Sequence, residues 1–421
     1  MGTGRSITLG AVGDIGYVKG VSAGAGNHGL DWSFDLVRPH LHSVDILFGN
    51  LECVLRPPGY PVEDLEPRTL VAPFPGPEIA EALVRAGFTF INLAHNHILD
   101  AGVVGMQYTR EVLESAGLVT GGVGRSQEEA RRLVTIRRNG LTVGLLCYCE
   151  DNNYVLGTRG PCHAFYERDT VLADVVAFKD RVDVLVVSVH ADLECTPAPS
   201  PPRLEAFRAI AEAGAHIVLG HHPHVPQGCE IHGASLIAYS LGNFLFPVRT
   251  SSLKNHAHAG ESFLLKVKVG ADGIQGFERL PVEIRGDHEE RPVPVTGADA
   301  EALLEYFHRL DAHLDDEEFL RDTWRAVARR KLGLYLAQAV TPPGRSTFQR
   351  GIRRLLKRMG LVAEPDVDRV IGELVARLCV TQENRLWMEE VLQMGMEEKE
   401  KRLSVADADP YHRPHFHFGG R

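Results

Sequence analysis

Residues 215–224 read Ala-His-Ile-Val-Leu-Gly-His-His-Pro-His, a short apolar run followed at once by histidines. The run of aliphatic residues predicts a buried β-strand. Histidines pack poorly in an apolar core, whereas the imidazole nitrogen is a common metal ligand. The stretch therefore predicts one strand of a buried sheet, with metal-binding side chains at its carboxyl end.

Polar residues of the metal-ligand type follow four other predicted strands in the same way. These residues are Asp14, Asn50, Glu52, His95, Asn96, His97, Asp100 and His190. The carboxyl ends of parallel strands share one edge of a sheet, so residues far apart in the chain can meet there. We therefore expect one crevice lined by these side chains and by His221, His222 and His224.

Short apolar runs alternate with helical patterns as far as about residue 290. The predicted strands are Ile7–Val12, Asp45–Phe48, Phe88–Leu93, Leu141–Cys147, Val182–Val189, Ala215–Leu219 and Ser235–Tyr239. The predicted helices between them are Pro77–Ala86, Gly105–Ala116 and Pro202–Ala213. This alternation indicates an α/β fold with largely parallel strands. Glu261–Val269 and Gly273–Ile284 predict an antiparallel hairpin that closes the sheet.

The composition changes near residue 290, and residues 289–300 resemble a linker. We expect a first domain over residues 1–290 and a helical C-terminal region over residues 297–421, acting as an appendage, a lid or a homodimer contact. Its predicted helices are Ala300–Leu314, Glu317–Ala339, Thr347–Met359, Val367–Val380 and Glu383–Lys401. We interpret the final His412, His415 and His417 as part of a mobile tail, and the alternative is that they bind metal or reach the active site.

The bulk composition excludes several classes of protein. The chain has 421 residues, 44% of them hydrophobic and 24% charged, with a net charge of −10, which argues against general nucleic-acid binding. Seven cysteines without a CxxC pair predict neither a disulfide scaffold nor a thiolate zinc site. There is no evident signal peptide and no run of about 18 apolar residues. We therefore expect a cytoplasmic protein without a membrane span.

The order of the motifs resembles that of the calcineurin-like metallophosphoesterases and, within them, the CapA family of capsule or poly-γ-glutamate biosynthesis. The matching segments are VGD at 12–14, GNLE at 49–52, NLAHNHILDAG at 92–102, VSVHADLE at 187–194, GAHIVLGHHPHVPQG at 214–228 and IAYSLGNFLF at 237–246. The resemblance implies a β-sandwich flanked by helices, in the layer order α-β-β-α, that binds one or two divalent metal ions.

The resemblance also suggests roles for individual residues. The metal ligands would be Asp14, Asn50, Glu52, Asn96, His190, His222 and His224. His97 would protonate the leaving group, and Asp100 would orient it. We assign His95, His221 and Asn243 to substrate contacts, although His95 and His221 could also point away from the site.

The mixed oxygen and nitrogen ligands favour Mn²⁺, Fe²⁺ or Zn²⁺ over Mg²⁺. Such an ion lowers the pKa of bound water, so that hydroxide forms near neutral pH and can attack a phosphate ester. Three positions depart from the family pattern. Gly16 replaces a histidine, Asn50 replaces an aspartate, and the residues after His190 differ. Fewer anionic ligands imply either a single ion or a labile second one.

Several of these residues have a structural interpretation as well. Asp14 could cap a helix, Asn50 could form a turn, and His190 could be a buried structural histidine. Our main hypothesis is a biosynthetic hydrolase acting on a small, phosphorylated anionic substrate, as a mono- or diester. The alternatives are a component of capsule or poly-γ-glutamate assembly, and a metal-binding scaffold without catalysis.

Overall fold

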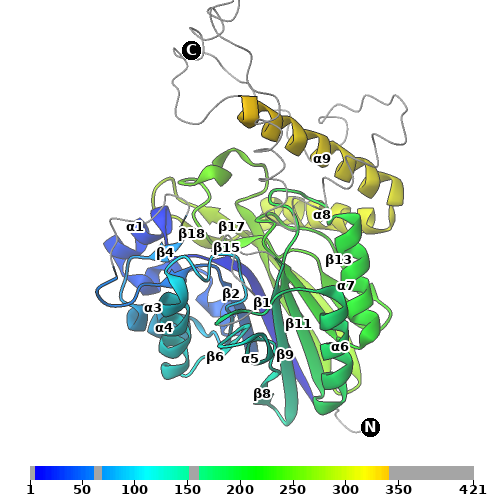
Figure 1. Ribbon diagram of the computed structural model, residues 1–421, viewed down its shortest axis with the longest axis horizontal. Helices are drawn as coiled ribbons and strands as arrows, with labels where there is room; N and C mark the ends of the chain where they lie inside the picture. The colour runs from blue at the N-terminus through cyan, green and yellow to red at the C-terminus, as the bar shows by residue number, and fades with distance from the viewer. Residues whose placement is uncertain (1–4, 61–68, 151–160, 341–421) are drawn as a thin grey trace, which may run out of the picture. The chain divides into compact units, whose positions relative to one another are not determined.

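The computed structural model describes residues 5–60, 69–150 and 161–340, with side chains as far as residue 329. Two β-sheets face each other between two layers of helices (Figure 1). The helices α3 (Gly76–Ala86) and α4 (Gly102–Ser115) cover one sheet, whereas α6 (Arg168–Phe178) and α7 (Pro201–Ala213) cover the other. The predicted α/β class and its α-β-β-α layer order are confirmed.

The first sheet has the order β18-β17-β16-β1-β2-β5-β6, and β15 pairs with the end of β1. Its strands are β1 (Ser6–Ile15), β2 (Ile46–Leu51), β5 (Phe90–Asn92), β6 (Val119–Gly121), β15 (Asn243–Leu245), β16 (Glu261–Gly270), β17 (Gly273–Arg285) and β18 (Arg291–Pro294). The strands β1, β2, β5 and β6 are parallel, whereas β16, β17 and β18 continue the sheet in antiparallel order.

The second sheet has the order β13-β14-β12-β11-β9-β8. Its strands are β8 (Val134–Arg138), β9 (Leu141–Cys149), β11 (Val184–His190), β12 (Ile217–His221), β13 (Cys229–His232) and β14 (Ser235–Ala238). The four central strands are parallel, and every residue of β11 and β12 is buried. Burial on both faces explains why these strands are continuous apolar runs rather than alternating ones.

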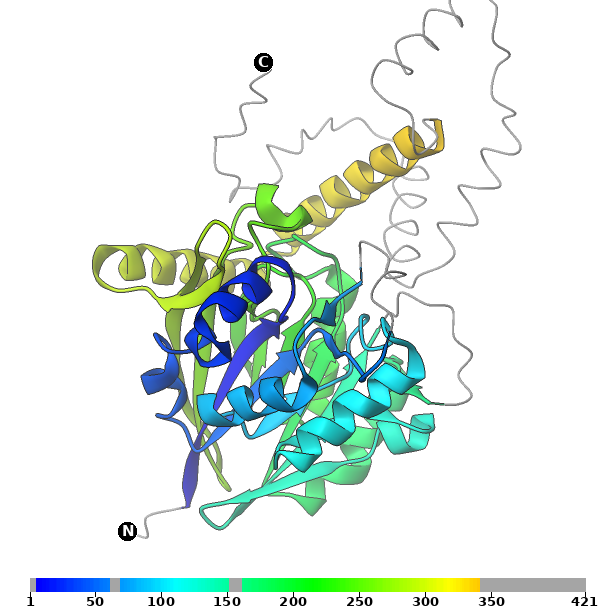
Figure 2. The ribbon, with the colours of Figure 1, turned by 90° about the vertical axis from the view of Figure 1, so that its left-hand side faces the viewer.

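Smaller elements complete the chain as far as it is described. They are α1 (Lys19–His28), η1 (Leu30–Ser33), α2 (Arg38–Leu41), β3 (Val54–Leu55), β4 (Val71–Ala72), β7 (Val123–Gly124), α5 (Gln127–Ala130), β10 (Cys162–His163), η2 (Lys179–Arg181) and η3 (Ser252–Asn255). Figure 2 shows α1, α3 and α4 in front of the sheets. Within the described residues, no helix is long and apolar enough to cross a membrane.

The predicted strands and helices that fall within the described residues all occur, with ends that differ by a few residues. One interpretation was wrong: part of the expected linker forms β18, which pairs with β17. The next helix, α8 (Gly297–Ala312), contacts β17 and β13 and is followed by η4 (His313–Asp315). This compact unit runs to Glu317, and a second unit begins with α9 (Glu317–Val340). The later predicted helices and the histidine-rich tail lie outside the described residues.

Candidate metal centre and active site

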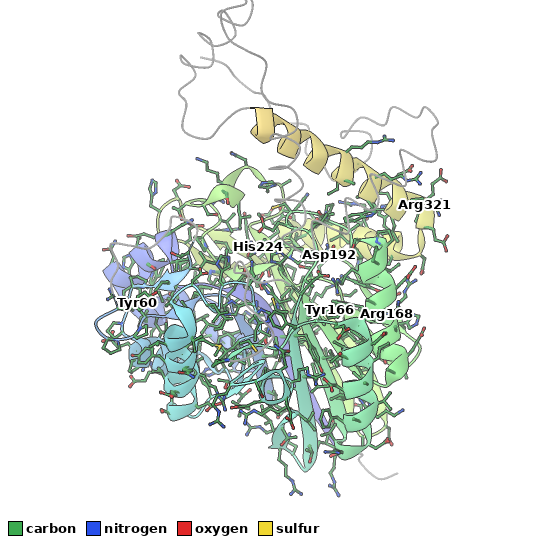
Figure 3. The ribbon with its side chains drawn as sticks, in the orientation of Figure 1. Tyr60, Tyr166, Arg168, Asp192, His224 and Arg321 are labelled. Atoms are coloured by element: carbon green, nitrogen blue, oxygen red, sulfur yellow. The ribbon has the colours of Figure 1, made fainter. Side chains whose placement is uncertain are left out.

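The carboxyl ends of strands from both sheets bring the predicted ligands together. In the first sheet, Asp14 of β1 lies in register with Asn50 of β2 and with Asn243 of β15. In the second sheet, His190 of β11 lies beside His221 of β12. The two edges lie at the same end of the molecule, where Figure 3 labels His224 and Asp192.

Two buried carboxylates occupy the centre of this edge. Asp14 and Glu52 are both 0% exposed. Asp14 Oδ1 accepts a hydrogen bond from Asn50 Nδ2 at 2.7 Å. Asp14 Oδ2 and both oxygens of Glu52 have no hydrogen-bond partner among the described residues. Removing a carboxylate from water without a partner is costly, so these oxygens are suited to a cation.

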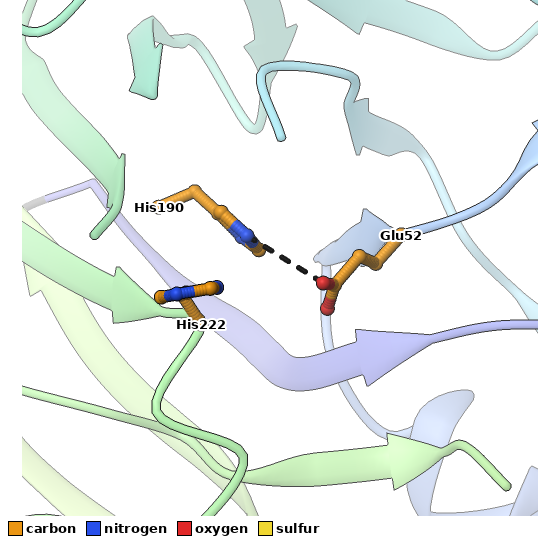
Figure 4. A group of neighbouring side chains, drawn as sticks. All are labelled: Glu52, His190 and His222. Atoms are coloured by element: carbon orange, nitrogen blue, oxygen red, sulfur yellow. Dashed lines mark ion pairs between the residues drawn. The ribbon is translucent and has the colours of Figure 1, made fainter. Parts of the chain in front are cut away.

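Imidazole nitrogens surround the two carboxylates. His190 Nε2 lies 3.6 Å from Glu52 Oε1, and Figure 4 shows this pair with His222 facing it. His224 lies between the carboxylates, with Nδ1 3.3 Å from Asp14 Oδ2 and Nε2 3.7 Å from Glu52 Oε1.

The donor atoms form three overlapping groups, within each of which they lie no more than 4.8 Å apart. The groups are Asp14, Glu52 and His224; Glu52, His190 and His222; and Glu194, His222 and His224. Nitrogen and carboxylate donors in this number fit Mn²⁺, Fe²⁺ or Zn²⁺. Because Glu52 belongs to two groups, the arrangement can hold one ion or two neighbouring ions.

The backbone is strained where it presents the histidines. His222 and His224 have positive φ angles of 94° and 58°, which side chains other than glycine seldom adopt. Such conformations cost about 1–3 kcal/mol each and persist where the surrounding structure enforces them. Here the strain directs two imidazoles from one short segment toward the same carboxylates, as expected for a functional site.

Amide side chains hold the predicted ligands in place. Asn92 Nδ2 donates to Asn50 Oδ1 at 2.8 Å, and the Asn50 amide in turn contacts Asp14 and lies 3.2 Å from His190 Nδ1. Asn243 Oδ1 lies 2.9 Å from His224 Nδ1. Both polar atoms of Asn50 are thus already engaged, so it orients neighbouring ligands in this arrangement. Its role as a ligand stays a prediction.

The histidines differ in the charge they carry. Burial lowers the pKa of His190, and it lowers the pKa of His222 to about 4, so both rings are neutral and ready to ligate near pH 7. Burial opposes the charge on His224 too, but Glu52 and Asp14 raise the pKa of His224 to about 10. Burial would raise the pKa of Asp14, but the adjacent imidazoles of His221 and His224 hold it well below its usual value.

A cavity of about 240 Å³ opens beside the centre, and His97, Asn96, Glu194 and His224 line one part of it. His97 Nδ1 lies 2.7 Å from Asp100 Oδ2, which also accepts a hydrogen bond from Leu70 N at 2.5 Å. The His97 side chain is 15% exposed, so solvent reaches it. Asn96 Oδ1 lies 3.1 Å from His190 Nε2. The predicted acid and its orienting carboxylate therefore lie at the mouth of the centre.

Three residues that we assigned to substrate contacts lie inside the protein. His221 stacks on Phe48 with ring centroids 5.6 Å apart, and it is 1% exposed. His95 and Asn243 are each 0% exposed. In this structure Asn243 orients His224, and His221 Nδ1 lies 3.4 Å from Asp14 Oδ1, so His221 faces a predicted ligand rather than the cavity. Contact of any of these three residues with substrate stays a prediction.

The prediction from sequence missed two members of the site. Glu194 joins His222 and His224 in one of the donor groups. Its signal was weak, because it lies in a loop four residues after His190 and a loop residue has no fixed direction. Asn92 lies at the end of β5 and fixes Asn50. A polar residue at the end of an apolar strand was the signal that could have identified it.

The residues that form this site belong to a segment of sequence that is similar to a known family. The profile of the family described as Bacterial capsule synthesis protein PGA_cap matches residues 8–248. The chain belongs to the PGA_cap family. The part of the chain that matches the PGA_cap profile contains every predicted metal ligand. It also contains His97, Asp100 and Asn243.

Curated PGA_cap relatives extend the match. The Capsule biosynthesis protein CapA of Bacillus anthracis is 30% identical over 305 residues, which cover 70% of this chain and 71% of that protein. The PGA biosynthesis protein CapA of Bacillus subtilis is 28% identical over 68% of this chain and 72% of that protein. A Probable polyglutamine synthesis accessory protein of Mycobacterium tuberculosis is 31% identical over 36% of this chain and 43% of that protein.

Proposed function

We propose that this chain is a metal-dependent hydrolase that acts on a phosphate mono- or diester. The observation that carries the proposal is the pair of buried carboxylates, Asp14 and Glu52, whose unpaired oxygens face imidazole nitrogens at the edge of a cavity. Asp14, Glu52, His190, His222 and His224 would hold the ion or ions, and Asn96 and Glu194 lie at the cavity side. When bound, a divalent cation supplies Lewis acidity toward a phosphoryl oxygen and toward water.

His97 is the group that can move a proton at this site. Asp100 accepts from Nδ1 of the ring, so Nε2 is the nitrogen that exchanges a proton with the leaving oxygen. Asp100 is in turn fixed by the backbone of Leu70, and this contact keeps the ring at the cavity wall. The pair therefore has the geometry of a general acid with its orienting carboxylate.

The test replaces His97 by asparagine and measures turnover of a panel of phosphomonoesters and phosphodiesters by protein reloaded with Mn²⁺, Fe²⁺ or Zn²⁺. We expect kcat to fall by about 10²–10⁴, the usual contribution of a general acid, at unchanged metal content. His232→Asn is the matched control, because His232 lies 2.9 Å from Glu212 in a similar pair elsewhere on the surface. Full activity in His97→Asn would contradict the assigned role.

A second candidate function is a role in assembling a capsule or poly-γ-glutamate chain. The match to the PGA_cap family and the names of the CapA relatives support it. The two functions separate in a strain that makes poly-γ-glutamate and lacks its own CapA. If this chain restores polymer and His97→Asn restores it equally well, the assembly role does not require hydrolysis.

The cellular setting is also part of the proposal. A cytoplasmic location and a place in a biosynthetic pathway remain predictions from the sequence. A homodimer formed through the C-terminal helices remains a prediction as well. Sedimentation of the full chain tests the dimer, and cell fractionation tests the location.

A further inference from the structure

The cavity beside His97 has a second wall that the proposed chemistry does not use. It is formed by Lys19 and by residues 246–253, called here the rim segment, of which Phe246, Pro247, Ser251 and Ser252 line the cavity. Lys19 is the one lysine or arginine among the described residues that line it. The structure records no ion pair for Lys19 within the described residues. This cation is therefore available to a ligand.

A buried carboxylate holds the rim segment in shape. Glu290 is 0% exposed and accepts hydrogen bonds from the backbone amides of Val248 at 2.6 Å, Arg249 at 2.7 Å and Thr250 at 3.1 Å. It also accepts from Thr250 Oγ1 at 2.5 Å. Because one side chain satisfies donors from three consecutive residues, it defines the path of the rim segment.

The same contacts fix the start of α1, where Lys19 lies. Thr250 Oγ1 accepts from Gly20 N at 3.0 Å, and Glu290 N donates to Gly20 O at 3.3 Å. A Cβ atom on Gly20 would lie 2.5 Å from Glu290 Oε1, so the two segments touch closely. Lys19 itself is held at a φ of 51°, which is uncommon for a side chain of its size. Lys19 therefore lies at the cavity in an unfavourable backbone conformation that the surrounding contacts enforce.

We propose that Lys19 is a specificity-determining residue that binds an oxyanion group of the substrate, a carboxylate or a second phosphate, away from the reacting ester. Glu290 is the positioning residue that holds Lys19 and the rim segment together. The identity of the reacting ester rests on the proposed function, whereas the oxyanion contact itself does not. In a chain with a net charge of −10, a lysine without an ion pair among the described residues gives the cavity lining a group that attracts anions.

The experiment compares three probes on Mn²⁺-loaded full-length protein by calorimetry. Methylphosphonate carries one anionic group, phosphonoacetate adds a carboxylate, and methylenediphosphonate adds a second phosphonate. We expect wild type to bind one of the two larger probes about ten-fold more tightly than methylphosphonate, the effect of one charge-assisted hydrogen bond. Whichever larger probe binds more tightly identifies the oxyanion.

The variant Lys19→Gln is expected to lose this ten-fold preference while keeping its affinity for methylphosphonate and its metal content. Lys19→Arg should retain most of the preference, because the charge remains. Lys254→Gln is the matched control, since Lys254 is an exposed lysine in η3 that does not line the cavity. The proposal is overturned if wild type shows no preference, if it binds none of the probes, or if Lys19→Gln keeps the preference.

Glu290 is tested with the same readout. Glu290→Gln places an amide nitrogen against backbone donors, so we expect the preference to fall. Glu289→Gln should keep it, because the side chain of the partly exposed Glu289 contacts the last residues of α1, Asn27 and His28. Thr250→Val removes the hydroxyl contacts with Gly20 N and with Glu290, and leaves the backbone contacts of Glu290 in place. It covers the case in which Glu290→Gln does not fold. An unchanged preference in Thr250→Val and in folded Glu290→Gln would overturn the positioning role.

The outcomes for the oxyanion subsite and for the proposed function are distinguishable. If no ester is hydrolysed but the preference depends on Lys19, the hydrolase proposal fails and the subsite stands. If esters are hydrolysed and the preference does not depend on Lys19, the subsite fails and the hydrolase proposal stands.

Discussion

His224 determines much of the chemistry of the candidate centre, because it lies between Asp14 and Glu52 with contacts of 3.3 and 3.7 Å. Its pKa of about 10 means that it carries a proton near neutral pH and partly neutralises the Asp14 carboxylate, whose pKa is lowered. His222 and His190 are neutral under the same conditions, because burial lowers the pKa of each. A divalent cation therefore has two imidazole ligands ready and must displace the proton of His224.

We predict that metal loading near pH 7.5 releases more than one proton, because His224 must be deprotonated to ligate and burial raises the pKa of Glu52 well above its usual value. The affinity for metal should accordingly rise with pH up to about 10. Calorimetry of Mn²⁺ binding in buffers with different ionisation enthalpies measures the proton count. The variant His224→Gln should release fewer protons when it binds Mn²⁺. An affinity that is flat between neutral pH and pH 9 would count against His224 as a ligand.

The same residue predicts the stability of the metal-free protein. The pKa of His224 is raised in the folded state, so its stabilising charge is fully present below the unfolded histidine pKa of about 6.5. That contribution is lost as pH rises from about 6.5 through the folded pKa of about 10. The free energy of unfolding of metal-free wild type, measured with urea, should therefore fall across this pH window. In His224→Gln it should fall less, and an equal dependence on pH in the two proteins would contradict this.

Among the elements, the approach of β15 to β1 is what joins Asn243 to Asp14. A Cβ atom on Gly13 would lie 1.9 Å from Gly242 O, and Asp14 N donates to that same carbonyl oxygen at 3.0 Å. A residue larger than glycine at this position must push the two strands apart. The site thus depends on a close backbone approach of Gly13 and Asp14 to Gly242.

We predict that Gly13→Ala destabilises the protein by about 1–3 kcal/mol, as overpacking usually does, and lowers metal affinity by displacing Asp14. Gly26→Ala is the control, because its Cβ would meet Phe74 no closer than 3.8 Å and alanine favours the α1 helix. Denaturant unfolding and metal titration of both variants check this. A neutral Gly13→Ala would show that the two strands can separate at no cost.

The elements also show what the sequence could and could not predict. Apolar runs such as Val184–His190 could be predicted as buried strands, because a short segment in which every residue is buried is typical of a strand covered on both faces. The strand β18 was taken for a linker because it contains Pro292 and Pro294. Proline is tolerated there because β18 lies at the edge of its sheet, where fewer backbone donors are needed.

Part of the candidate site could be predicted from the sequence and part could not. Strand ends predicted that Asp14, Glu52 and His190 would meet, because sheet topology alone brings them to one edge. The direction of a loop side chain depends on its individual φ and ψ angles. For that reason the sequence separated His222, as a ligand, from His221 but left open whether His221 points away or contacts substrate, whereas in the structure it stacks on Phe48 and lies 3.4 Å from Asp14 Oδ1.

At the scale of the whole molecule, α8 completes the compact unit that carries the site. Arg279 of β17 forms two hydrogen bonds with Asp311 of α8, at 2.8 and 2.6 Å. Phe307 of the same helix is 0% exposed and lies 5.0 Å from Phe263 between ring centroids. The predicted domain boundary before residue 297 would separate these partners.

We predict that a chain ending at residue 317 unfolds cooperatively and binds metal like the full chain. A chain ending at residue 296 loses Phe307 and should be less stable by at least about 3–5 kcal/mol, the usual cost of removing a buried phenylalanine. Urea unfolding and metal content of the two chains test this. Equal stability of the two would place the domain boundary where the sequence predicted it.

The most direct test of the central claim is a titration of metal-stripped protein with Mn²⁺ in which bound metal and phosphoester turnover are measured in the same samples. We predict that turnover rises in proportion to metal bound, levels off at one or two ions per chain, and is absent from Glu52→Gln. A fully loaded wild type that hydrolyses no mono- or diester, or a Glu52→Gln variant as active as wild type, would contradict the account.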